Sequence, residues 1–70
     1  MANRTYRITE IVGTSNESID QAIKNGIKRV TETVRHVDWV EVTEIRGSVR
    51  DNDVADIQVG LKVGFRLEDS

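Results

Sequence analysis

The stretch VADIQVGLKVGFRL, residues 54–67, decides the fold of this chain. Its apolar residues alternate without a break from Ala55 to Leu67, and the residues between them are mostly polar or glycine. A period of two places these apolar side chains on one face, which predicts a single long β-strand with one buried face. At about 3.3 Å per residue, such a strand spans roughly 46 Å.

A helix over about residues 16–36 is predicted to cover part of that face. Its apolar residues form one stripe on a 3.6-residue period, made of Ile19, Ala22, Ile23, Ile27, Val30, Val34 and Val37. We expect Thr14 or Ser15 to cap its N-terminus. At about 1.5 Å per residue the helix spans roughly 32 Å, which is less than the strand. Another copy of the chain is therefore expected to cover the overhang or the sheet edges.

Two further strands are predicted over residues 5–12 and 39–50, which are rich in β-branched and aromatic residues. Residues 51–53, Asp-Asn-Asp, are predicted to form a tight turn, an interpretation favoured over a metal-binding loop. Because the helix reverses the chain, the second strand should run parallel to the first, with the third returning between them. The prediction is an α+β fold: one β-α-β-β domain over residues 1–70, whose three-stranded antiparallel sheet, in order 1-3-2, partly wraps the helix.

The second strand is the least regular of the three. Its alternation predicts that Val40 and Val42 face one way, whereas Trp39, Thr43 and Ile45 face the other. Gly47 is a candidate for a β-bulge within it.

Size and composition limit the classes of function. A domain of 70 residues buries only about 60% of its unfolded surface, so an added source of stability is expected. The chain has no cysteine and only one histidine, His36, which leaves self-association as the expected source. The net charge of −2 is unlike that of a general nucleic-acid binder. Neither a signal peptide nor a membrane-spanning apolar run is recognised, so we expect a cytoplasmic protein without membrane or nucleic-acid partners.

The candidate binding residues lie on the polar face of the long strand and at the start of the second strand. Gly60 and Gly64 leave that face low, so a planar ligand or a neighbouring backbone could lie there, although an ordinary solvated face is the simpler interpretation. Trp39, the only tryptophan, belongs either to the core or to a half-exposed stacking site. Gln58 offers both hydrogen-bond donors and an acceptor. A tryptophan face and a glutamine edge together suit a planar heteroaromatic ring.

Catalytic arrangements are not recognised in the sequence. One histidine next to Asp38 does not make a catalytic triad, and Gly13-Thr14-Ser15 at the expected helix start is only a weak anion site. The carboxylates are spread over turns and the helix. We therefore expect a protein that is not an enzyme and has no metal site.

Beyond these patterns, the chain closely resembles the dodecins, a family of small flavin-binding proteins. The resemblance extends over nearly the whole chain and rests on the order and spacing of several segments. These segments are residues 5–7 (TYR), 10–15 (EIVGTS), 38–42 (DWVEV), 45–47 (IRG) and 58–68 (QVGLKVGFRLE), together with the single helix.

The resemblance implies a hollow homododecamer that binds flavins in pairs at two-fold contacts between subunits. Each pair would be stacked between two symmetry-related copies of Trp39, and Gln58 would bond the polar edge of the isoalloxazine ring. Arg46 and Arg66 are candidates for contact with the phosphate. The expected ligand is flavin mononucleotide (FMN), with riboflavin or FAD as alternatives and coenzyme A as a further ligand.

The implied role is flavin storage, buffering and photoprotective quenching rather than turnover, with no protein partner other than the chain itself. The alternative is a non-flavin binding module that uses the open sheet face for RNA or coenzyme A.

Overall fold

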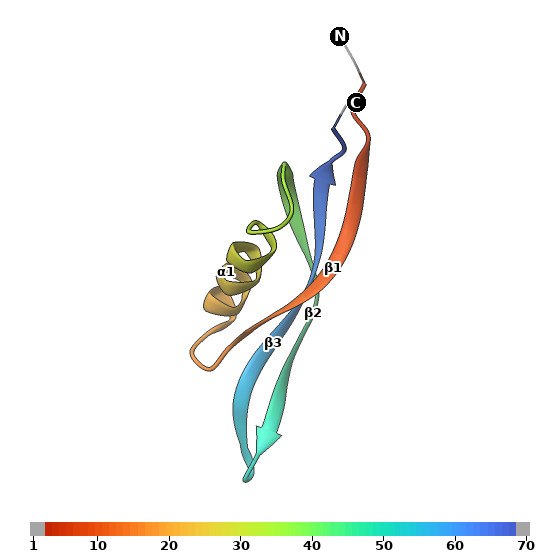
Figure 1. Ribbon diagram of the computed structural model, residues 1–70. Coiled ribbons are helices and arrows are strands. Elements are labelled where there is room, and N and C mark those ends of the chain that lie inside the picture. The colour runs from red at the N-terminus through yellow and green to blue at the C-terminus, as the bar shows by residue number, and fades with distance from the viewer. Residues whose placement is uncertain (1–2, 69–70) are drawn as a thin grey trace.

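The computed structural model describes residues 3–68, which form one sheet and one helix (Figure 1). The elements are β1 (Tyr6–Ser15), α1 (Ile19–Val30), β2 (Val37–Arg50) and β3 (Asp53–Arg66). The strand order is β1-β3-β2, and β3 is antiparallel to both neighbours. The predicted β-α-β-β topology and strand order are therefore confirmed.

Helix α1 is shorter than predicted and begins later. Its N-cap is Ser18, whose Oγ accepts a hydrogen bond from the backbone N–H of Gln21 at 3.0 Å. The prediction that Thr14 or Ser15 caps the helix was wrong, because β1 continues through Ser15. The buried Ser15 hydroxyl instead accepts the N–H of Glu17 at 2.9 Å and shapes the turn before the helix.

The core lies between α1 and the side of β3 that faces it. Its buried apolar residues are Ala22, Val30, Val59, Leu61 and Val63. The helix approaches β1 so closely that a Cβ on Gly13 would collide with the backbone carbonyl of Ala22, and a Cβ on Gly26 would lie 3.3 Å from the Cα of Gly13. Two glycines therefore bring the backbones of α1 and β1 into direct contact.

Strand β2 changes register along its length. One irregularity falls between Val42 and Glu44, after which Ile45 pairs with Val59. The prediction that Ile45 shares a side with Trp39 was therefore wrong, because an extra residue in β2 reverses the alternation. Gly47 stays paired with Ile57, and the next register shift lies one residue beyond it, between Ser48 and Val49.

A two-residue turn connects β2 to β3. Asp51 and Asn52 have φ of 55° and 64°, and left-handed backbone at both central positions is the geometry that matches the twist of a hairpin. The predicted turn at residues 51–53 is confirmed.

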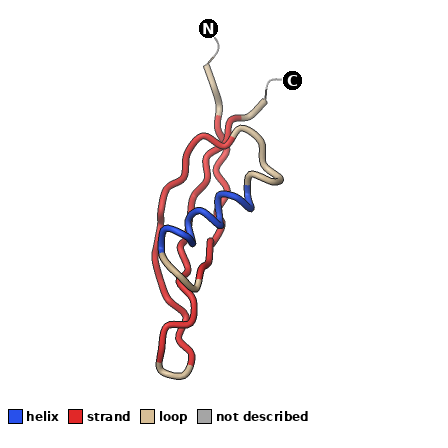
Figure 2. Tube along the Cα trace, turned by 90° about the vertical axis from the view of Figure 1, so that its left-hand side faces the viewer, coloured by secondary structure: helices blue, strands red, loops and turns tan. Residues whose placement is uncertain are grey.

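The molecule is long and thin, with principal extents of 55 × 20 × 15 Å (Figure 2). Its radius of gyration is 14.6 Å, whereas a compact chain of this length is expected to have about 11 Å. Its exposed surface is 5432 Å², against about 4,400 Å² for a compact monomer of its mass. The 12-residue helix spans only about 18 Å, so the uncovered part of the sheet is larger than predicted.

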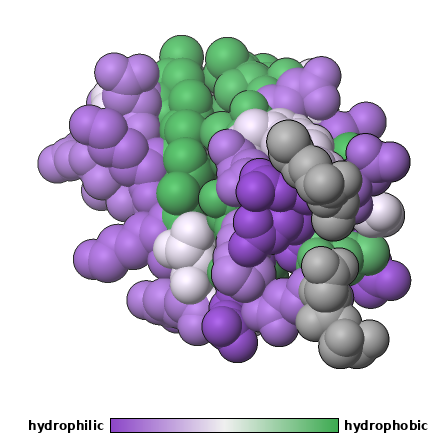
Figure 3. Space-filling model, turned by 90° about the horizontal axis from the view of Figure 1, so that it is seen from above, coloured by the Kyte–Doolittle hydropathy of each residue, from purple (hydrophilic) through white to green (hydrophobic). Residues whose placement is uncertain are grey.

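Apolar side chains reach the surface on both sides of this sheet. Val42 and Ile45 are 44% and 54% exposed on the side that carries the helix, and Ile8 and Val12 are 53% and 48% exposed on the other. Seen from above, hydrophobic side chains gather in a band between polar ones (Figure 3). Exposed apolar surfaces of this kind are typical of contacts with another chain.

Candidate functional site

The candidate site lies on the side of the sheet opposite α1, which we call the open face. Alternation and register assign the following residues to it: Tyr6, Ile8, Glu10, Val12 and Thr14 of β1, Trp39, Glu41, Glu44 and Arg46 of β2, and Gln58, Gly60, Lys62, Gly64 and Arg66 of β3. All four predicted binding residues, Trp39, Arg46, Gln58 and Arg66, are on this face.

The indole of Trp39 covers Gly64. The two residues pair across β2 and β3, and a Cβ added to Gly64 would collide with the indole ring. Tyr6 packs against the indole, with ring centroids 4.9 Å apart and planes tilted by 53°. Trp39 remains 40% exposed, so part of the indole is available for stacking. This supports the half-exposed interpretation of Trp39, whereas the contribution of Tyr6 was not predicted.

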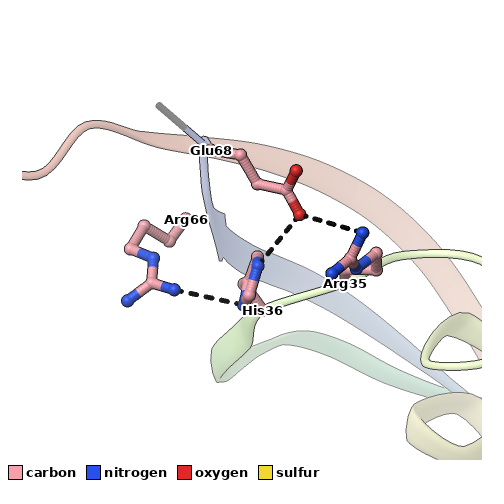
Figure 4. A network of polar contacts seen from close by, with 4 residues as sticks. All are labelled: Arg35, His36, Arg66 and Glu68. Carbon is pink, nitrogen blue, oxygen red and sulfur yellow. Dashed lines mark hydrogen bonds and ion pairs between the residues drawn. The ribbon is translucent and has the colours of Figure 1, made fainter. Parts of the chain in front are cut away.

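Arg66 lies beside this aromatic pair and joins a polar network at the end of the sheet (Figure 4). Its Nη2 donates to Nδ1 of His36 at 3.2 Å, and Nε2 of His36 lies 3.0 Å from Oε1 of Glu68. Arg35 Nη1 approaches the same carboxylate oxygen at 3.3 Å. Because a guanidinium can only donate, Nδ1 of His36 accepts and Nε2–H donates, which assigns the neutral Nε2–H tautomer in this arrangement.

A shallow pocket of about 320 Å³ adjoins the network, lined by residues 33–36 and 65–68. His36 has a φ of 62°, a left-handed conformation that turns the chain from the helix exit into β2. Its carbonyl accepts the backbone N–H of Arg66 at 3.0 Å. Backbone and side chain of His36 therefore both hold Arg66 at the end of the open face.

A second group of polar residues surrounds Gln58. Its Oε1 accepts a hydrogen bond from Nε of Arg46 at 2.7 Å, and Nη1 of Arg46 lies 3.1 Å from Oε2 of Glu44. The side chains of Thr43 and Glu44 occupy the space above Gly60, where an added Cβ would lie 2.7 Å from the Thr43 hydroxyl. The low surface predicted at the glycines is thus partly filled by side chains of β2.

The predicted binding residues therefore form two clusters in one chain. The aromatic cluster consists of Tyr6, Trp39, Gly64 and Arg66, and the amide cluster of Glu44, Arg46 and Gln58. Gly64 and Gln58 are six residues apart on β3, about 20 Å along an extended strand. One tricyclic ring cannot contact Trp39 and Gln58 of the same chain over that distance. A single ring can contact both residues only if they come from two chains.

The described residues 3–68 contain no group of three or more His, Cys, Asp or Glu side chains placed to hold a metal ion. They also contain no helix long and apolar enough to cross a bilayer.

Comparison with known proteins decides the family. The family model described as Dodecin matches residues 5–68. The chain belongs to the dodecin family. It is 46% identical over 67 residues to the dodecin of Thermus thermophilus, covering 96% of this chain and 97% of that one.

Solved dodecin structures share the fold over essentially the full length of this family member. Dodecin from Streptomyces coelicolor superposes with a TM-score of 0.94 at 56% identity and covers all of both chains. Dodecin from Streptomyces davaonensis has a TM-score of 0.93 at 54% identity, covering 97% of this chain and all of that one. A calcium dodecin from Mycobacterium tuberculosis, described as having a novel calcium-binding site, is more distant, with 26% identity and a TM-score of 0.82.

Proposed function

We propose that this dodecin binds flavins at contacts between its own copies, and that it stores, buffers and quenches them without turning them over. FMN is the proposed ligand, with riboflavin and FAD as alternatives. Each ring would stack on Trp39, and two rings would lie between the two tryptophans of a symmetric contact. A flavin enclosed on both faces leaves no room for a second substrate, which supports binding rather than catalysis.

The observation that carries this proposal is the separation of the aromatic and amide clusters on one open face. A two-fold contact that turns the open faces of two chains toward each other would allow Trp39 and Gln58 of different chains to reach the same ring. Trp39 of one chain could then stack on a ring whose polar edge bonds Gln58 of the partner. The exposed apolar side chains on both sides of the sheet and the elongated shape of the molecule support contacts between copies of the chain.

Arg66 is the proposed phosphate contact. It lies in the aromatic cluster, and a guanidinium suits a phosphate because it offers several donors in one plane. Its bond to the neutral His36 ring leaves other guanidinium donors to bind an anion.

A homododecamer is the proposed assembly. Sedimentation velocity at micromolar concentration measures it directly, and a stable monomer would contradict the proposal. Burial of the surfaces around Ile8, Val12, Val42 and Ile45 is expected to stabilise each copy, since apolar area contributes about 25 cal/mol per Å² when it leaves water.

Titration with FMN tests the flavin proposal. The expected result is strong quenching of flavin fluorescence on binding, because a tryptophan in contact with the excited ring can donate an electron to it. Trp39→Ala should reduce affinity by at least about 100-fold through loss of stacking and buried area, while the assembly survives.

Arg29→Met is the matched control, because the Arg29 side chain is 87% exposed on α1 and lies outside both clusters. Its titration curve should coincide with that of the wild type. Unchanged flavin fluorescence in the wild-type titration would refute the proposal.

A further inference from the structure

The guanidinium of Arg46 is engaged by two neighbours within its own chain. Nε donates to Oε1 of Gln58 at 2.7 Å, and Nη1 contacts Oε2 of Glu44 at 3.1 Å. The guanidinium is planar and its donors are fixed relative to one another, so these two contacts determine its orientation. Arg46 therefore differs from Arg66, whose side chain has one neutral ring as its partner.

The contact with Arg46 fixes which end of the Gln58 amide faces outward. If the amide were reversed, its NH2 group would point at the Arg46 N–H, and two donors would oppose each other. Oε1 therefore stays on Arg46 and Nε2 is directed away from it. Two N–H donors are free to bond an acceptor, and Oε1 keeps a second lone pair for an incoming N–H.

The β-bulge of β2 places Glu44 where it can support this arrangement. The register shift between Val42 and Glu44 directs both Thr43 and Glu44 over Gly60, and the absence of a Cβ there leaves room for them. Glu44 and Arg46 then project from the same side of β2 two residues apart, so the carboxylate meets the guanidinium. Glu44 thus restrains Arg46, and Arg46 restrains Gln58.

We propose that Glu44 and Arg46 are positioning residues that preorient the Gln58 amide for a ring edge carrying adjacent carbonyl and N–H groups. Arg46 then acts on ring recognition and not on the phosphate. This inference rests on the proposed flavin site and deepens it, since it assigns recognition of the ring to three side chains that contact one another in series, Glu44, Arg46 and Gln58. It also separates the roles of the two arginines.

The test compares riboflavin with FMN, which differ by the phosphate. Arg46→Met keeps the length of the side chain but removes its donors, and should weaken both ligands by the same factor, about tenfold. Arg66→Met should weaken FMN about tenfold and leave riboflavin nearly unchanged. Arg46→Lys keeps the charge but not the planar guanidinium, so its affinities for riboflavin and FMN should be nearly as low as those of Arg46→Met. A selective loss of FMN in Arg46→Met, or full rescue by lysine, would overturn the inference.

A double-mutant cycle tests whether Arg46 acts through Gln58. Riboflavin should bind Arg46→Met/Gln58→Ala no more weakly than it binds Gln58→Ala alone, because nothing remains to be positioned. Losses that add fully would count against the inference. Glu44→Gln should show a smaller loss, about threefold, in the same direction for both ligands.

The orientation of the amide can also be measured without ligand. The chain has two glutamines, Gln21 and Gln58, so labelling of their amide nitrogens gives two NMR signals to follow in the assembled protein. Arg46→Met should shift the Gln58 signal and leave that of Gln21, which bonds Asn25 at 2.8 Å, in place. If the wild type binds no flavin, the flavin proposal fails but this measurement still decides whether Arg46 orients Gln58. An unmoved Gln58 signal would contradict the inference.

Discussion

The two sides of β3 use glycine in opposite ways. On the helix side, the glycines belong to the partners of β3, and Gly13 and Gly26 let the backbones of β1 and α1 touch. On the open face the glycines belong to β3 itself, and Gly60 and Gly64 receive side chains from β2. The lack of a Cβ therefore allows two backbones to come into contact on the helix side. On the open face it leaves room for side chains of the candidate site.

This difference has an energetic consequence. A new Cβ at Gly13 meets a backbone carbonyl, which cannot move without disrupting the helix. A new Cβ at Gly64 meets a side chain, which can rotate away and leave the sheet intact. Substitution on the helix side should damage the fold, whereas substitution on the open face should damage the site.

The largest expected effect is therefore that of Gly13→Ala. The added methyl would force α1 away from β1, and we expect a loss of at least about 3 kcal/mol in the free energy of unfolding. Urea denaturation at one fixed protein concentration measures it, since association also contributes to stability.

Gly47→Ala is the matched control, because an added Cβ there meets mainly the Val54 side chain, at 3.1 Å. Its denaturation midpoint should differ little from that of the wild type. Equal losses in the two variants would show that backbone contact at Gly13 has no special role.

An intermediate effect is expected for Gly64→Ala. The methyl displaces the Trp39 indole from its seat beside Tyr6, so flavin affinity should fall about 30-fold, or about 2 kcal/mol. Unfolding free energy should fall less than in Gly13→Ala. Flavin fluorescence titration measures the affinity, and denaturation of the same preparation measures the free energy of unfolding. A variant that loses stability but keeps wild-type flavin affinity would contradict the prediction.

The smallest expected effect is that of Ser18→Ala on the helix side. Removing the cap leaves the N–H of Gln21 without its partner, which should cost about 1 kcal/mol of stability. Asn16→Ala, at an exposed neighbouring position, serves as the control. Flavin affinity of the folded protein should not change in either variant, because neither residue reaches the open face.

The topology could be predicted from sequence because β3 has an unbroken period of two and the turn at residues 51–53 has a strong local signature. The helix bounds could not, because the apolar stripe continues into Val34 and Val37, which lie in the loop and in β2. The side occupied by Ile45 could not either, since a bulge depends on how two strands pair and not on the alternation within one.

The candidate site was predictable in part. Trp39 and Gln58 were identified by chemistry and by resemblance, but their separation into two clusters emerges only when the register with β3 is known. Tyr6 and Glu44 were missed. Tyr6 reaches Trp39 across the whole width of the sheet, and Glu44 reaches Arg46 through the bulge, so neither contact has a signal in local sequence.

The strand order has a consequence for how the chain folds. Strand β3 meets β2 through a two-residue turn, but it pairs with β1 across almost the full chain, with Tyr6 opposite Arg66. Closing the longer loop costs more conformational entropy, so we expect the β2–β3 hairpin to form first and β1 to join it late, together with the helix. In pulse-labelled hydrogen exchange during refolding, amides of the hairpin should gain protection before those of β1. The strand that supplies Tyr6 to the aromatic cluster would then be the last to arrive, so the site would mature at the end of folding.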